Sequence, residues 1–296
     1  MMSQLLLVFM RLLAPLPLSW VRALGWVLGH ALYALAHERR HIVQVNLGLC
    51  FPHLSGAKRT RMARHHVVRV MQALLDRSWL WHGSMAQLRR RLTVLGDVSP
   101  LQGDSAVVML APHFVGLDAG GTALTMLGGV RMASIYVPQS ALALDDWVRD
   151  GRNRSGAVAL YFRHGGVKPI VSGLRQGDKL YLLPDMDFGR QESLFVPFFG
   201  VQTATVPSLS RFARLGRAQV LSVVTRMTAS GYITEIGPVW ADFPSSDVQA
   251  DTLRMNQALE SLIRTMPEQY YWVHKRFKTR PEGEPGVYDG VGVKKA

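Results

Sequence analysis

One histidine and one aspartate stand out by their spacing, because Asp118 follows His113 after five residues in the string APHFVGLD (residues 111–118). A carboxylate against one imidazole nitrogen fixes the tautomer and leaves the other nitrogen free to accept a proton. The pair therefore predicts a general-base dyad. The alternative is a structural histidine beside an aspartate that only caps its helix. The short spacing alone leaves both interpretations open.

The elements around this pair determine whether the two side chains meet. Residues 106–110 (AVVML) are an apolar run typical of a buried strand, and Pro112 ends it because proline cannot extend a strand ladder. From Leu117 the chain (LDAGGTALTML) is typical of a helix. Residues five positions apart lie about 140° apart around one helix. The side chains meet only if His113 is on the preceding loop and Asp118 on the first turn, and the sequence predicts that arrangement.

Composition limits the class of protein. The 296 residues suffice for one large domain or two small ones, and the single cysteine, Cys50, excludes an internal disulfide framework and is typical of a reducing compartment. The formal net charge is +13, from 34 Lys and Arg against 21 Asp and Glu. This excess favours nucleic acid, anionic membrane surfaces or acidic proteins as partners, and charge alone does not choose among them.

The first 36 residues are the most hydrophobic part of the chain. Arg11 interrupts them, which argues against a cleavable signal peptide, and the longest charge-free run, residues 23–36, is shorter than the ~20 residues of an untilted spanning helix. A marginal transmembrane helix and an interfacial hairpin are therefore both open, and a buried core helix is the third possibility. The basic string HERRH (residues 37–41) would then lie on the cytoplasmic side.

Beyond the dyad the chain alternates between strand-like and helix-like segments. Strands are predicted at residues 133–137, 157–162, 179–183, 218–227 and 232–236, and helices at 142–154, 167–176, 205–215 and 248–266. This alternation predicts an α/β fold with a mixed, largely parallel sheet flanked by helices. We expect a membrane anchor or interfacial helical segment at residues 1–40, one α/β domain at 41–280 and an irregular tail at 281–296.

Two further polar clusters follow predicted helices or strands, where α/β folds gather their sites. Arg149, Arg152 and Arg154 suit an anionic substrate, because guanidinium groups bind phosphate bidentately, but they equally suit an exposed helix end. Asp185 and Asp187 could orient the arginines, and two carboxylates alone only weakly suggest a metal, so no metal site is predicted. Phosphate-loop, serine-nucleophile and zinc-cysteine motifs do not occur in the sequence.

Several strings together resemble one family, the bacterial lipid A biosynthesis acyltransferases of the lauroyl and myristoyl acyltransferase group. The dyad string would be weak by itself, since glycerolipid acyltransferases share it. The more specific strings are FVPFFG and QYYWVHKRFKTRP. The resemblance covers nearly the whole chain and is carried by residues 37–52, 111–118, 183–200 and 267–285.

The resemblance implies a glycerolipid-acyltransferase-like fold and an inner-membrane enzyme whose catalytic domain faces the cytoplasm. Such enzymes transfer a fatty acyl chain from acyl carrier protein to a hydroxyl of a lipid A precursor. His113 would be the base and Asp118 would orient it and stabilise its imidazolium. Arg152 and Arg154 would hold phosphate or the developing anion, with Asp185 and Asp187 as further substrate-binding residues. No metal or organic cofactor is required, because the thioester already carries the activation.

Two other interpretations remain open from the sequence. The acceptor could be a lysophospholipid or an aminolipid, because the dyad, the membrane segment and the charge would look alike. Many family members have glutamate where this chain has Asp118, which slightly favours that reading. A non-catalytic membrane-surface or nucleic-acid-binding protein would explain the charge, but not a buried strand that delivers His113 beside an aspartate. We therefore expect acyl carrier protein, the lipid precursor and membrane lipids as partners, and no nucleic acid.

Overall fold

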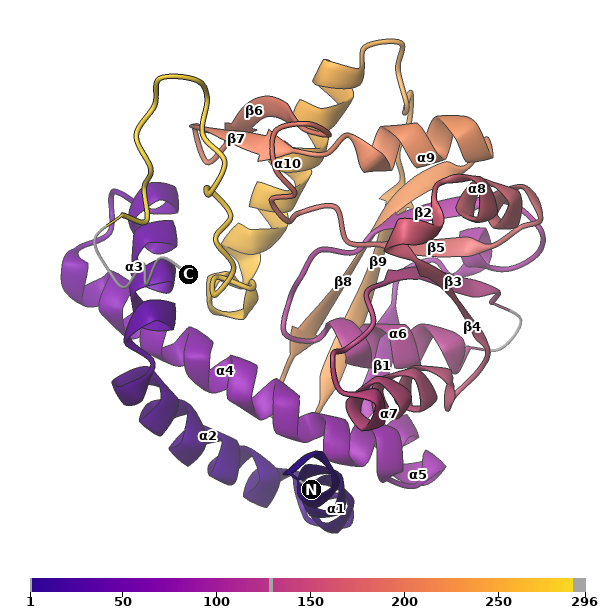
Figure 1. The fold of residues 1–296 in the computed structure, drawn as a ribbon. Helices are drawn as coiled ribbons and strands as arrows, with labels where there is room; N and C mark the ends of the chain where they lie inside the picture. Colours follow the sequence, from indigo (N-terminus) through magenta and orange to yellow (C-terminus); the bar gives the residue numbers. More distant parts are fainter. Residues whose placement is uncertain (1, 128–129, 290–296) are drawn as a thin grey trace.

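A seven-stranded sheet forms the centre of the molecule, in the strand order β1-β9-β8-β2-β5-β3-β4 (Figure 1). The computed structural model describes residues 2–127 and 130–289. Neighbouring strands are parallel except for β8 and β9, which form an antiparallel pair. The predicted mixed, largely parallel sheet is thus confirmed. Its strands are β1 (Leu92–Leu95), β2 (Val107–Leu110), β3 (Met132–Tyr136), β4 (Val158–Phe162), β5 (Lys179–Leu182), β8 (Gln219–Met227) and β9 (Tyr232–Val239).

Both faces of this sheet are covered by helices, so its central strands are apolar on both sides. All four residues of β2 are buried: Val108 and Leu110 pack in the cluster beneath α8 and α9, while Val107 and Met109 pack on the side of α6. Side chains alternate between the faces of a strand. A doubly covered strand therefore becomes a continuous apolar run. The covering helices are α6 (Leu117–Thr125), α7 (Leu142–Asn153), α8 (Lys168–Arg175), α9 (Ser208–Gly216) and α10 (Val248–Thr265).

Within the described residues, five helices precede the sheet, and α4 is the long one that joins the others to it (Figure 1). Gly25 and Gly29 let α2 approach α4 closely: a Cβ at these positions would come within 2.9 Å of the Gln72 Cα and 2.6 Å of the Val68 Cα. The glycines are therefore required by the packing of the two helices. The five helices are α1 (Met2–Leu13), α2 (Leu18–Leu35), α3 (His37–Cys50), α4 (Gly56–His82) and α5 (Met85–Arg91).

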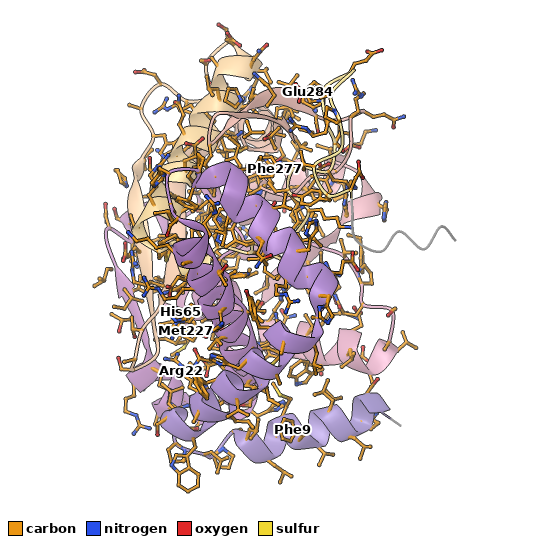
Figure 2. The ribbon with its side chains drawn as sticks, turned by 90° about the vertical axis from the view of Figure 1, so that its left-hand side faces the viewer. Phe9, Arg22, His65, Met227, Phe277 and Glu284 are labelled. Atoms are coloured by element: carbon orange, nitrogen blue, oxygen red, sulfur yellow. The ribbon has the colours of Figure 1, made fainter. Side chains whose placement is uncertain are left out.

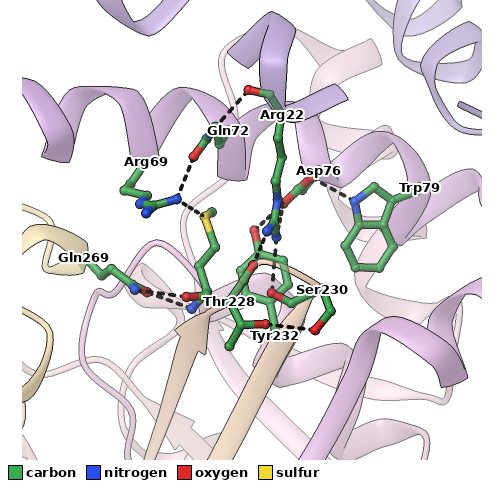
Figure 3. Close-up of polar contacts among 11 residues, drawn as sticks. Arg22, Arg69, Gln72, Asp76, Trp79, Thr228, Ser230, Tyr232 and Gln269 are labelled. Carbon is green, nitrogen blue, oxygen red and sulfur yellow. Dashed lines mark hydrogen bonds and ion pairs between the residues drawn. The ribbon is translucent and has the colours of Figure 1, made fainter. Parts of the chain in front are cut away.

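A buried polar network ties α2 to α4 and to the β8–β9 turn (Figure 3). The Arg22 guanidinium donates to the Asp76 carboxylate at 3.0 and 3.1 Å and to the backbone carbonyls of Thr228 and Gly231. The same carboxylate accepts hydrogen bonds from the Tyr232 hydroxyl, 2.8 Å, and the Trp79 indole, 2.9 Å. The Arg22–Asp76 ion pair of the first third of the chain is therefore also bound to residues of the last third.

The outer surfaces of α1 and α2 are apolar. Figure 2 shows α1, with Phe9, at the end of the molecule opposite Glu284. Within residues 2–127 and 130–289, no helix combines the length and the apolar character that crossing a membrane would require. The division of the chain at residues 40 and 280 stays a prediction. The exposed large apolar side chains are Leu5, Leu6, Val8, Phe9 and Leu12 on α1 and Trp20, Trp26, Val27, Leu28, Leu32 and Leu35 on α2.

Some elements differ from the sequence-based expectation. An antiparallel hairpin, β6 (Leu194–Phe198) and β7 (Val201–Thr205), occupies the segment before α9, and the helix expected from residue 205 begins at Ser208. Strand pairing with β6 holds residues 201–205 extended. The segment after α10 crosses back over α3 without forming a helix or strand longer than one short turn, and up to residue 289 the expected tail is irregular. Residues 290–296 of that tail lie outside the described residues.

Candidate active site

His113 and Asp185 lie at the carboxyl ends of two neighbouring parallel strands, β2 and β5. Each strand is followed by a proline, Pro112 or Pro184, which ends its ladder and turns the chain out of the sheet. The Asp185 carboxylate binds His113 twice, because one oxygen accepts from the His113 backbone N–H at 3.0 Å and the other lies 2.7 Å from the imidazole Nδ1. The sheet therefore positions the histidine and its carboxylate as one unit.

This contact gives His113 the character of a base. Burial raises the pKa of the Asp185 carboxyl, but the His113 ring and the hydrogen bonds it makes outweigh burial and lower that pKa overall. An ionised Asp185 can only accept, so Nδ1 is the donor and Nε2 carries the free lone pair. The His113 side chain is 19% exposed whereas that of Asp185 is 1% exposed. The buried carboxylate of Asp185 thus fixes the position of the more exposed imidazole ring.

The expected pairing of His113 with Asp118 is wrong. The predicted placement is confirmed, with His113 on the loop and Asp118 on the first turn of α6, but the carboxylate of Asp118 is held by two arginines. Arg77 from α4 binds one oxygen at 2.6 to 2.8 Å, and Arg152 from α7 binds the other at 3.1 Å. The turn of α6 directs Asp118 toward α4 and α7, while the loop directs His113 toward the end of β5.

The three charged groups form a cluster with a net charge of +1. Burial on its own raises the pKa of the Asp118 carboxyl, but Arg77 and Arg152 outweigh burial and bring that pKa down to about 2. The Arg152 guanidinium carbon also lies 5.7 Å from the centre of the Tyr136 ring. Asp118 therefore stays ionised at neutral pH and holds both guanidinium groups side by side.

Two other sequence-predicted residues have structural contacts instead of facing an open site. Arg154 lies just after α7 and donates to the carbonyls of Leu80 and Gly83, so it caps the end of α4. The Asp187 carboxylate accepts from the backbone N–H groups of Gly189 and Thr279 and from the Thr279 hydroxyl, all at 2.7 to 2.9 Å. Both side chains therefore have structural contacts, and the expectation that Arg154 and Asp187 contact substrate stays a prediction.

A large cavity of about 930 Å³ opens beside His113, and we call it the main cavity. Its size lies within the ~300–1,000 Å³ of small-molecule sites. One part is polar and contains the Arg77–Asp118–Arg152 cluster together with Thr122 and Tyr136. The other part is mainly apolar. Its lining includes Met132 and Val158 on the α6 side of the sheet and Ile135, Ile170, Leu182 and Phe212 on the side of α8 and α9.

Sequence reasoning missed Arg77 and the role of Asp185 as the partner of His113. Arg77 lies five residues before the end of α4, between Asp76 and Ser78, where one arginine carries no recognisable motif. The sequence places Asp185 at the end of a strand, but only the order of the strands shows that this strand is the neighbour of β2.

Comparison with known proteins identifies the family of this chain. The sequence pattern of the family described as bacterial lipid A biosynthesis acyltransferase matches residues 1–279. This chain belongs to that family. The protein is therefore an acyltransferase of lipid A biosynthesis, and the resemblance found in its motifs is confirmed.

Individual relatives extend over nearly the full chain. A "Lipid A biosynthesis acyltransferase" of Haemophilus influenzae is 32% identical over 95% of this chain and 88% of its own. The "Lipid A biosynthesis palmitoleoyltransferase" of Escherichia coli is 32% identical, covering 92% and 90%, and the "Lipid A biosynthesis lauroyltransferase" of the same organism is 31% identical, covering 94% and 91%. The crystal structure of a 1-acyl-sn-glycerophosphate acyltransferase from Thermotoga maritima aligns with a TM-score of 0.39 at 12% identity, over 83% of this chain and 96% of that one.

Proposed function

We propose that this acyltransferase moves a fatty acyl group from an acyl carrier protein thioester to a hydroxyl of a lipid A precursor, with His113 as the general base. The observation that carries the proposal is the Asp185 contact, because it fixes the His113 tautomer while His113 also lines the main cavity. Asp185 takes the orienting role that the motif spacing had suggested for Asp118.

The reaction follows from this geometry in two proton transfers. Nε2 of His113 accepts the proton of the acceptor hydroxyl as its oxygen attacks the thioester carbonyl. Asp185 stabilises the imidazolium that forms, since the carboxylate remains hydrogen-bonded to Nδ1. When the tetrahedral intermediate collapses, the C–S bond breaks and the leaving thiolate takes the proton from Nε2. The products are an ester and a free thiol, and the base is regenerated.

The two parts of the main cavity suit the two kinds of group that must bind. Its apolar part suits an acyl chain, which is recognised by area and shape. Its polar part has Arg77 and Arg152 prealigned by Asp118, and such cations stabilise phosphate or a developing oxyanion. Arg152 therefore keeps its proposed substrate role.

We also propose that α1 and α2 hold the protein on the cytoplasmic surface of the inner membrane. Their exposed apolar side chains include Trp20 and Trp26, residues that favour the headgroup region. The net charge of +13 would strengthen binding to anionic lipid and to acidic acyl carrier protein. Vesicles of anionic lipid should shift the tryptophan emission to the blue, and an unchanged spectrum would contradict this part of the proposal.

The test is an assay of the purified, detergent-solubilised protein with a series of acyl carrier protein thioesters. Two acceptors are offered separately, a tetra-acylated lipid A precursor and a lysophospholipid, and His113→Ala serves as the inactive control. The mass of the product reports both the acceptor and the chain length. We expect acylation of the lipid A precursor and none with His113→Ala.

Other outcomes would contradict defined parts of the proposal. Acylation of the lysophospholipid alone would keep the base chemistry and reject the acceptor. Transfer from acyl-coenzyme A but not from acyl carrier protein would reject the donor. Near-normal turnover by His113→Ala, with the fold intact by circular dichroism, would reject the mechanism.

A further inference from the structure

A second cavity of about 440 Å³ lies between the N-terminal helices and the segment that follows Tyr270, and we call it the side cavity. It is formed where α2 ends and α3 begins, against one face of α4. Its lining includes Leu32, Tyr33, Arg39, Arg40, Val70 and Val273. Neither the reaction proposed above nor the family assignment gives this cavity a role.

The side cavity shares two wall residues with the main cavity, Met186 and Tyr271. Met186 directly follows Asp185, and the Tyr271 backbone N–H donates to the His113 carbonyl at 2.9 Å. The rings of His113 and Tyr271 are 6.2 Å apart between centroids. One layer of side chains therefore separates the side cavity from the base.

The opposite end of the side cavity opens beside the apolar surface of α2. Leu32 is 38% exposed and lines the cavity, and Leu35, one turn further on, is 76% exposed. A molecule held with its apolar part against α2 would have its adjoining polar part at the side cavity. The cavity thus lies between the apolar outer surface and His113.

The rim of the side cavity is basic. Arg39 is exposed there and uses one N–H on the Val273 carbonyl at 3.3 Å, while Arg40 caps the carbonyls at the end of α2. Arg64 lies on α4 with its guanidinium carbon 5.7 Å from the centre of the Tyr33 ring. The nearby carboxylate of Glu38 is paired with Lys275 at 3.1 Å. The rim therefore offers an excess of guanidinium groups to an anion.

We propose that the side cavity binds the phosphate-bearing headgroup of the acceptor glycolipid, with Arg39 as a phosphate contact. This inference rests on the proposed function, since it concerns the acceptor of that same reaction. An acyl chain would leave the arginines of the rim without a partner, and the main cavity already offers an apolar part. A carrier protein would contact the outer surface, whereas this recess of about 440 Å³ between helices has room for a sugar phosphate.

The experiment compares Arg39→Ala with Arg61→Ala. Arg61 is an exposed arginine of α4 that does not line the side cavity, so the two variants lose the same charge. We expect Arg39→Ala to raise KM for the lipid A precursor about fivefold and the double variant Arg39→Ala/Arg64→Ala about tenfold or more. KM for acyl carrier protein thioester and kcat at saturating acceptor should remain within about twofold. Arg61→Ala should match the wild type in all three.

A second variant tests the cavity without changing charge. Val70→Phe places a larger side chain in the side cavity from α4 and should also raise KM for the precursor alone. Equilibrium binding of the precursor in detergent micelles, read by intrinsic tryptophan fluorescence, gives an answer that does not need turnover. Removal of the precursor phosphates should weaken its binding to the wild type more than its binding to Arg39→Ala/Arg64→Ala.

The outcomes separate this inference from the proposed function. A wild type that binds the phosphorylated precursor through Arg39 but does not acylate it would contradict the function and leave the side cavity assigned. An active wild type whose KM for the precursor is unchanged in Arg39→Ala/Arg64→Ala and in Val70→Phe would overturn the inference. A rise in KM for acyl carrier protein alone would assign the rim to the donor protein and likewise overturn it.

Discussion

His113 and Asp185 follow the ends of two neighbouring parallel strands at the same distance. Leu110 of β2 is in register with Leu182 of β5, and each functional residue follows its leucine by three positions. The carboxylate therefore reaches both the backbone and the ring of His113, at 3.0 and 2.7 Å. The sheet register, and not the spacing within the HxxxxD string, determines which carboxylate orients the histidine.

Replacing either aspartate by asparagine tests this relationship. Asp185→Asn removes the negative charge beside Nδ1 and no longer fixes the tautomer, so we expect kcat to fall by about 10² to 10⁴. Asp118→Asn weakens the hold on Arg77 and Arg152, so we expect mainly a rise in KM for the anionic substrate. Steady-state kinetics with acyl carrier protein thioester and lipid A precursor give both values.

The ranking of the two variants discriminates between the pairings. If Asp118 oriented the base, Asp118→Asn would lose kcat as severely as His113→Ala and Asp185→Asn would be the milder change. Asp185→Glu is a useful comparison, because it retains the charge but shifts the carboxylate by one methylene. Circular dichroism spectra like that of the wild type would show that lost activity is not lost folding.

The Arg22–Asp76 ion pair should be essential for stability. The two side chains are 9% and 2% exposed, and removal of one partner from a buried pair costs about 3–5 kcal/mol. We expect Asp76→Asn to lower the free energy of unfolding by a few kcal/mol, measured by urea denaturation in detergent. Glu235→Gln is the matched control, since its partner Arg226 lies 3.6 Å away at the surface and such pairs contribute less than about 1 kcal/mol. Equal effects of the two variants would contradict this assignment.

His66 makes stability depend on pH. Its Nδ1–H donates to the Glu268 carbonyl, and burial lowers the pKa of His66 to about 4, although that hydrogen bond acts in the opposite direction. In the unfolded chain the pKa returns to about 6.5, so below that pH the unfolded state binds more protons. Stability is therefore lost as the pH falls from about 6.5 to 4, by about 3 kcal/mol in total.

Urea denaturation at several pH values measures this slope. His66→Gln keeps a donor for the Glu268 carbonyl but does not titrate, and we expect a flatter dependence between pH 6.5 and 4. Replacement of the exposed His53 by glutamine is the matched control, because it changes the same residue type outside the buried site. A wild-type slope in His66→Gln would mean that His66 is not the group that takes up the proton.

Two adjacent glycines of α6 should respond in opposite ways. A Cβ at Gly121 meets nothing within 4 Å, whereas a Cβ at Gly120 would lie 2.2 Å from the Thr225 hydroxyl and 2.9 Å from that of Tyr181. We expect Gly121→Ala to stabilise by about 0.5–1 kcal/mol, because alanine favours the helix. Gly120→Ala should destabilise by about 1–3 kcal/mol through overpacking. Thermal unfolding monitored by circular dichroism measures whether each variant is more or less stable than the wild type.

Most of the central fold was predictable from periodicity. The strand at Val107–Leu110, the helix from Leu117 and the terminal helix Val248–Thr265 appear within a few residues of their expected bounds. Apolar runs and glycine or proline stops act locally, so a local pattern finds them. The β6–β7 hairpin was not predicted, because the pairing of two short strands stabilises it.

Only part of the site was predictable from the sequence, because local patterns do not show which elements are neighbours in the fold. His113 was identified from its own neighbourhood, and Asp185 from its position after a strand. Their contact depends on β2 and β5 being neighbours, although 72 residues separate the two side chains in the chain. Arg77 reaches Asp118 from a helix 41 residues away. Such contacts need the order of the strands and the path of α4, which local patterns do not contain.

The position of Arg22 has a consequence for how the chain is assembled during synthesis. Its guanidinium binds carbonyls 206 and 209 residues later, at Thr228 and Gly231. When α1 and α2 leave the ribosome, the β8–β9 turn that completes their docking does not yet exist. More than two thirds of the chain must therefore be synthesised before the apolar helices can dock completely. A bilayer surface would shield them from aggregation during that interval.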